Sequence, residues 1–153
     1  MVVLESARTA ERGLGMMFGR LRMRLGDPEV DLLYRPDASW NLYGALVKHI
    51  CYTTQGYLGR RMVDLGIELP AGDAHWSAEG LDGAALGRLV DETEAICHRA
   101  LEAMTLATWA EEIEIYGRTM ARGDLPLFAL AHGSQHVGQM LLMDRLRKAA
   151  TAS

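Results

Sequence analysis

Residues 124–147 read DLPLFALAHGSQHVGQMLLMDRLR, a run of helix-forming residues with two histidines near its centre. Asp124 suits the N-cap of a helix, and Pro126 suits its first turn, where an N–H group would have no helical partner. At 1.5 Å per residue, the helix that follows is about 33 Å long. Such a helix is long enough to run from one end of a helical bundle to the other.

The two histidines of this helix, His132 and His136, are four residues apart. At 100° per residue their side chains point about 40° apart and lie one turn from each other, so both imidazoles can reach one ion. The residues close to them on this projection favour an inward stripe, and they are Phe128, Gln139, Met143 and Leu146. A pair of inward histidines needs polar partners or a ligand.

A second helix is predicted from Trp40 to about Leu65, where Gly66 and Pro70 end the apolar period. His49 lies in this helix on a face that also carries Leu42, Ala45, Leu46, Thr53 and Gly56. The small residues of that face would leave space beside His49. We therefore interpret His49, His132 and His136 as a metal site with vacant positions, although the spacing alone also allows three satisfied core histidines.

The remaining segments complete an all-α protein. A first helix is predicted over 14–25, with an earlier start left open, and a third over 84–104. Residues 68–83 are rich in turn formers and form a long connector, and residues 105–123 form another, with a short extended piece at 112–115. The prediction is one four-helix bundle domain over residues 1–153.

Composition and charge exclude several classes of function. The net charge of −4 gives no general attraction to nucleic acid or anionic lipid, and the basic cluster Arg20, Arg22 and Arg24 is interpreted as a solvated helix face.

Cys51 and Cys97 do not form a Cys-x-x-Cys pair, which favours reduced thiols in a cytoplasmic protein. The N-terminal segment fits neither a signal peptide nor a membrane span.

Other catalytic motifs are absent from the sequence. It has no His-Glu-x-x-His of zinc proteases, no Glu-x-x-His of di-iron bundles, and no phosphate-binding glycine loop. His98 shares a polar stripe with Glu94 and Glu102 and is interpreted as solvent-facing. His75 lies in the long connector and is not assigned to the site.

Two segments resemble the marker regions of the DinB-like family of small metal-binding bundles. They are SWNLYGALVKHI at 39–50 and AHGSQHVGQ at 131–139. The family pattern of one histidine on the second helix and His-x-x-x-His-x-Gly-Gln on the fourth corresponds to His49, His132, His136, Gly138 and Gln139. Many relatives have a basic residue or a further histidine around the last histidine, where this chain has Gln135 and Val137.

The resemblance implies an up-down-down-up bundle, with the connector at 68–83 as the crossover between the second and third helices. It also implies zinc or nickel in the site and a small-molecule substrate. We expect a thiol-dependent S-transferase or isomerase that uses a low-molecular-weight thiol. The alternatives are a metal-dependent hydrolase and a non-catalytic, stress-related metal-binding bundle. No general base is identified.

Two further expectations follow from the predicted helices. Leu127, Leu130, Val137 and Leu141 form a second apolar stripe on the fourth helix, which predicts a homodimer. Metal ligation requires unprotonated imidazoles, so we expect the metal to be lost below about pH 6.

Overall fold

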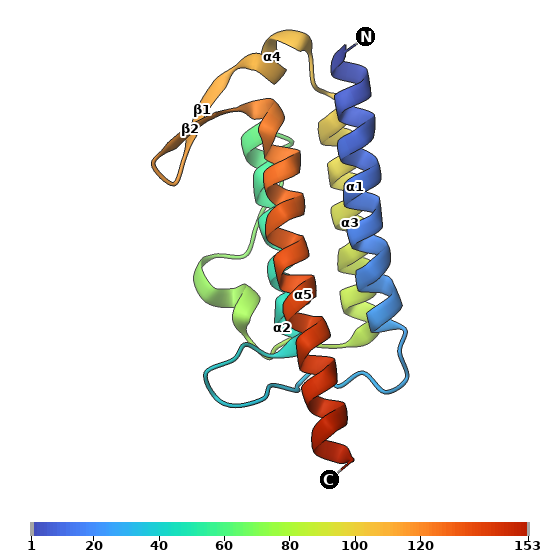
Figure 1. Ribbon diagram of the computed structural model, residues 1–153. Coiled ribbons are helices and arrows are strands. Elements are labelled where there is room, and N and C mark those ends of the chain that lie inside the picture. The colour runs from blue at the N-terminus through green and yellow to red at the C-terminus, as the bar shows by residue number, and fades with distance from the viewer. Residues whose placement is uncertain (1, 153) are drawn as a thin grey trace.

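The computed structural model describes residues 2–152, with side chains from Glu5 onward, and most of this part is helical (Figure 1). Its long helices are α1 (Val2–Leu25), α2 (Tyr43–Gln55), α3 (Gly83–Glu102) and α5 (Leu125–Thr151). Both α1 and α2 pack against α3 and α5. In Figure 1, α1 and α5 run from top to bottom, whereas α2 and α3 run upward. The predicted all-α class is thus broadly confirmed.

Several short elements join the long helices. A π-helix, η1 (Gly56–Met62), continues α2, and a 3₁₀ turn, η2 (Gly72–Trp76), lies in the connector to α3. Between α3 and α5 the chain forms α4 (Leu106–Ala110), strands β1 (Glu112–Ile115) and β2 (Arg118–Ala121), and the 3₁₀ turn η3 (Arg122–Asp124). None of the helices in the described part is long and apolar enough to cross a membrane.

The second helix differs from its predicted bounds at both ends. The Tyr43 N–H donates to the carbonyl of Tyr34 at 3.0 Å, and the Gly44 N–H donates to that of Leu32 at 2.9 Å, so the preceding connector fixes the start of α2. The α-helical pattern ends at Gln55, and the chain continues as a π-helix rather than as the expected α-helix to Leu65. Local sequence periodicity does not distinguish these two helix types.

The connector between α3 and α5 contains the extended piece that was predicted. The alternating residues 112–115 form β1, which pairs antiparallel with β2 in a hairpin that projects from one end of the molecule (Figure 1). Asp124 precedes α5 as predicted, but its side chain accepts from the Ala121 N–H at 3.2 Å instead of capping the helix. α5 also extends beyond the predicted end at Arg147.

The buried side of α5 coincides only in part with the stripe predicted from the histidines, since Met143 is buried but Leu146 is exposed. His132 and His136 are half-buried at its margin, and the buried residues of α5 are Leu125, Pro126, Ala129, Gly133, Val137, Met140 and Met143. The predicted second apolar stripe is divided, because Val137 is buried and Leu130 packs on Gly13 of α1, whereas Leu127 and Leu141 are exposed. The homodimer inferred from this stripe stays a prediction.

Part of the basic cluster on α1 joins helices rather than facing solvent alone. The Arg22 guanidinium donates to Asp91 at 2.7 Å and also pairs with Glu94, both on α3. Arg24 forms an ion pair with Asp144 of α5. The interpretation of these two arginines as a purely solvated face was therefore wrong.

Gly133 permits the closest approach of three helices. A Cβ atom at this position would lie 2.3 Å from Met17 Sδ of α1 and 3.3 Å from Ile50 Cγ2 of α2. A Cβ atom there would displace the Met17 side chain, and Ile50 would have to shift by a few tenths of an ångström. The close packing of α5 on α1 and α2 thus depends on this glycine.

We predict that Gly133→Ala destabilises the protein by about 1–3 kcal/mol, because overpacking outweighs the better helix propensity of alanine. Gly138→Ala in the same helix is the matched control, since a Cβ atom there meets no other atom within 4 Å. That control should stabilise the helix by up to about 1 kcal/mol. Urea unfolding measures both changes, and an equal effect of the two substitutions would contradict the packing role of Gly133.

Candidate metal centre

The three histidines proposed from the sequence meet at the contact between α2 and α5. His49 lies in the middle of α2, and His132 and His136 lie on successive turns of α5. One ring nitrogen from each can be chosen so that the three atoms lie within 4.8 Å of one another. Such a cluster could hold a metal ion, and all three residues are half-buried.

The imidazole rings surround one small volume. The ring centroids of His49 and His136 are 4.8 Å apart, those of His49 and His132 are 5.1 Å apart, and those of His132 and His136 are 4.7 Å apart. The Nε2 atoms of His49 and His132 approach to 3.0 Å. Two nitrogens on one zinc ion, each at about 2.0–2.1 Å in tetrahedral geometry, lie roughly 3.3–3.4 Å apart, so only a small adjustment separates this pair from a ligating one.

A hydrogen bond to Gln139 fixes the orientation of the His136 ring. His136 Nδ1 donates to Gln139 Oε1 at 2.7 Å, and because an amide oxygen only accepts, this bond keeps the proton on Nδ1 and frees Nε2. The Nδ1 atom of His49 is buried without a hydrogen-bond partner. An ion held by Nε2 of His49 would leave this Nδ1 atom unpaired, so the fit to an ion rests on the Nε2 atoms of His49 and His132 and on the orientation of His136. The residues present thus fit a divalent metal ion.

Two residues of the long connector cover His49. The Trp76 ring stacks on the His49 ring with centroids 4.0 Å apart and planes inclined by 22°. The His75 ring meets the His49 ring edge-on at 5.0 Å. Neither residue is assigned to the site from the sequence, because a short 3₁₀ turn in a long connector has no periodic pattern that relates it to a distant helix.

Lys48 holds this cover in place. Its ammonium group donates to the carbonyl of Glu79 at 2.8 Å and to the carbonyl and hydroxyl oxygens of Ser77 at 3.2 Å each. Lys48 is buried and directly precedes His49 in the chain. The same turn of α2 therefore supplies one site histidine and the anchor for the connector that covers it.

The environment favours the uncharged form of His49 and His132. Burial, followed by the neighbouring His136, His132 and His75, lowers the pKa of His49 to about 3. Burial and then His136 also lower the pKa of His132. Neutral imidazole is the form that ligates metals, so protons compete with a metal ion at these two residues at lower pH than at a free imidazole. Loss of the metal below about pH 6 stays a prediction.

The donor set consists of imidazoles. Within the part of the chain that the structure describes, no carboxylate or thiolate belongs to the cluster. Three protein ligands leave at least one position for water or a substrate, as in catalytic zinc sites. The arrangement thus suits binding and activation of a small ligand more than a closed structural site.

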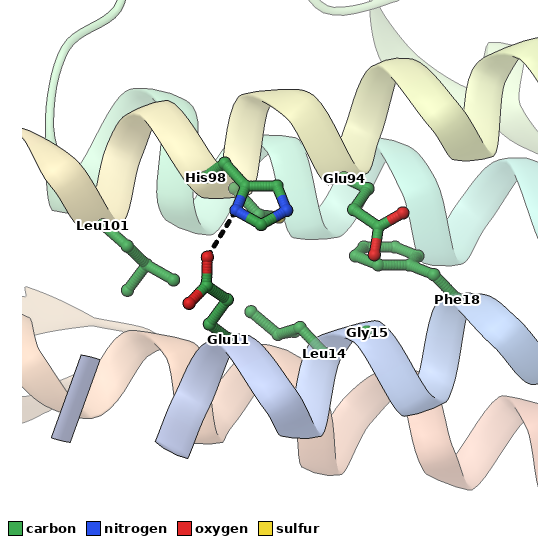
Figure 2. A pocket seen from close by; sticks show the side chains of 8 residues that line it. Glu11, Leu14, Gly15, Phe18, Glu94, His98 and Leu101 are labelled. Atoms are coloured by element: carbon green, nitrogen blue, oxygen red, sulfur yellow. Dashed lines mark ion pairs between the residues drawn. The ribbon is translucent and has the colours of Figure 1, made fainter. Parts of the chain in front are cut away.

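His98 lies in a different part of the molecule. Figure 2 shows its ring directed toward α1, where Nδ1 lies 2.5 Å from Glu11 Oε1 in a small pocket between α1 and α3. The residue is exposed, as predicted, but it contacts a neighbouring helix as well as solvent. It is not part of the three-histidine cluster.

Comparison with known families gives one result. The sequence model of the DinB superfamily matches residues 17–140, a region that includes all three histidines and most of the chain. Among curated proteins, no match was found.

We predict that Lys48→Met loosens the connector over His49 and lowers the free energy of unfolding by about 1–3 kcal/mol, because hydrogen bonds from a charged donor are lost. Faster hydrogen exchange of the amides at residues 72–79 measures the local effect. Lys148→Met, an exposed position near the end of α5, is the matched control and should leave exchange there unchanged. Equal exchange rates in wild type and Lys48→Met would contradict the anchoring role.

We also predict that the metal-free protein loses stability as pH falls from about 6.5 toward 3. The unfolded chain protonates His49 near pH 6.5, whereas the folded chain protonates it only near pH 3, so unfolding takes up a proton between these values. Stability from this residue is complete above pH 6.5. Urea unfolding at pH 7 and pH 5, after chelator treatment, should show a smaller difference for His49→Gln than for wild type. An identical difference would refute this assignment.

Proposed function

The chain belongs to the DinB superfamily, and from this premise we propose that it binds one divalent metal ion, zinc or nickel, through His49, His132 and His136. The observation that carries the proposal is the convergence of three ring nitrogens to within 4.8 Å at the contact between α2 and α5. The Gln139 amide, which orients His136, and the 3.0 Å approach of the Nε2 atoms of His49 and His132 support it.

The proposed activity is thiol-dependent S-transfer or isomerisation of a small-molecule substrate. When bound, a divalent ion with an open position lowers the pKa of a bound thiol or water, which gives a nucleophile at neutral pH. The chain contributes neutral imidazoles, a fixed orientation of His136, and a Trp76 ring that excludes water from one face of His49. Since the cluster contains no carboxylate among the described residues, a substrate that supplies its own thiolate is favoured.

Two alternatives remain from different functional classes. A metal-dependent hydrolase would cleave esters or amides without a thiol, and a non-catalytic, stress-related metal-binding bundle would show no turnover. Assays of the metal-loaded protein with and without a thiol cosubstrate separate these classes. The half-exposed position of the three histidines favours a catalytic site over a purely structural one.

We further propose that α1, α2, α3 and α5 form one domain with the up-down-down-up bundle topology implied by the family. The packing of α1 and α2 against α3 and α5 supports this assignment. The connector between α2 and α3 would then be the crossover, and η2 with His75 and Trp76 would be its functional part.

We predict about one zinc or nickel ion per chain in untagged protein purified without chelators. His49→Ala and His132→Ala should each abolish stoichiometric binding, because two imidazoles do not complete the ligand set. Elemental analysis measures the metal content. At a free zinc concentration 100-fold above Kd, wild type should also be stabilised by about 2.7 kcal/mol relative to the metal-free state.

His98→Ala is the matched control for these substitutions, since it removes an imidazole outside the cluster. Its metal content should equal that of wild type. Absence of metal from wild type after addition of both zinc and nickel would refute the proposed function.

A further inference from the structure

A groove begins one helical turn beyond His49 along α2. Its volume is about 440 Å³, and its lining residues are Tyr52, Thr53, Gly56, Tyr57, Arg60, Arg61, Leu69 and Tyr116. Thr53 follows His49 by four residues, which is about 6 Å along the helix axis. The Tyr57 ring lies 6.3 Å from the His132 ring, centroid to centroid. The groove is therefore next to the candidate metal centre.

Two arginines, Arg60 and Arg61, line the groove, and no acidic residue of the described part of the chain lines it with them. Arg60 and Arg61 are exposed, neither forms an ion pair within the described residues, and the groove lining contains no Asp or Glu. The chain as a whole is acidic, with 20 Asp and Glu residues against 16 Lys and Arg residues. Arg60 and Arg61 both line the groove, and the planar fork of a guanidinium group matches a carboxylate.

The end of the π-helix that carries these arginines is held by another part of the chain. The Arg122 guanidinium donates to the carbonyls of Arg61 and Met62, at 3.1 Å each, and to Glu111 Oε1 at 3.0 Å. η1 is thus tied to the segment that precedes α5. A π-helical segment inside a helix is frequently found at functional sites, and here it forms one wall of a groove.

Tyrosines form the other walls. Tyr57 is buried, and burial raises the pKa of its hydroxyl, which stays a hydrogen-bond donor at neutral pH. The hydroxyl oxygens of Tyr57 and Tyr116 are 3.4 Å apart. Tyr116 occupies the turn of the β1–β2 hairpin with a φ of 51°, a conformation that disfavours a bulky residue. The strained turn brings its ring to the groove, which suits recognition of a ligand with apolar and polar parts.

We propose that this groove binds the carboxylate end of the thiol cosubstrate, with Arg60 and Arg61 as the anchors and the thiol directed toward the three histidines. The substrate class is thus an anionic, carboxylate-bearing low-molecular-weight thiol. The inference rests on the proposed function for the position of the thiol. The anion site itself depends only on the groove, so the two parts can fail separately.

Calorimetric titrations of the full chain with glutathione and two of its derivatives test the groove. S-methylglutathione keeps both carboxylates but has no free thiol, and glutathione diethyl ester keeps the thiol but has no carboxylates. We expect S-methylglutathione to bind the chelator-treated and the zinc-loaded protein equally. Glutathione should bind more tightly when zinc is present, and the diethyl ester should bind more weakly than glutathione in both forms.

Arg60→Gln/Arg61→Gln should weaken the binding of S-methylglutathione by about tenfold, which corresponds to about 1.4 kcal/mol, since both cationic donors to the carboxylate are lost. Arg20→Gln removes an exposed arginine of α1 outside the groove and should change Kd by less than about twofold. Circular dichroism of each variant establishes that it remains folded.

The outcomes separate the groove from the metal centre. Unchanged affinity of the folded double variant, or no saturable binding of S-methylglutathione by wild type, would overturn the anion site even if zinc binds. Displacement of S-methylglutathione by an equal concentration of inorganic phosphate would assign the groove to small inorganic anions and overturn the thiol assignment. Arginine-dependent binding with no gain from zinc would keep the anion site and reject the proposed orientation of the thiol.

Discussion

The close packing of Gly133 between Met17 of α1 and Ile50 of α2 determines the geometry of the candidate metal centre. Gly133 follows His132 directly, and Ile50 follows His49 directly. Close packing of α5 on the Ile50 side chain of α2 therefore places the two imidazoles side by side. The 3.0 Å approach of their Nε2 atoms is a consequence of helix packing, and the single missing side chain at residue 133 makes that packing possible.

Partial burial gives the histidines two properties that usually conflict. His49 and His132 are desolvated, which favours the neutral form that ligation requires, yet all three rings are only half-buried, so a ligand can reach them. Trp76 contributes to the desolvation, and Lys48 fixes the segment that follows it. The long connector between α2 and α3 is thus part of the site environment, because its Trp76 ring covers one face of the His49 ring.

The change from α-helix to π-helix after Gln55 links the histidines to the groove beyond them. A π-helix has more residues per turn than an α-helix, so it changes the directions in which later side chains point. Along one continuous helical segment, the chain presents His49, then Thr53 and Tyr57, and finally the two unpaired arginines. The candidate metal ligand His49 and the proposed anion-binding surface therefore have a fixed relative position, as recognition of a two-ended ligand would require.

The sequence alone determined the helical class, the identity of the three clustered histidines, and the strand-forming piece at 112–115, because each depends on local spacing or composition. It did not determine which side of α5 is buried, since both Val137 and the histidines lie on plausible stripes, and only packing against α1 and α2 decides between them. Nor did it reveal Trp76, Lys48, Tyr116 or the arginine pair. Trp76, Tyr116 and the arginines lie on a turn, a hairpin and a π-helix, and Lys48 lies on α2 but contacts the distant connector. Contacts between segments distant in sequence give no periodic signal within either segment.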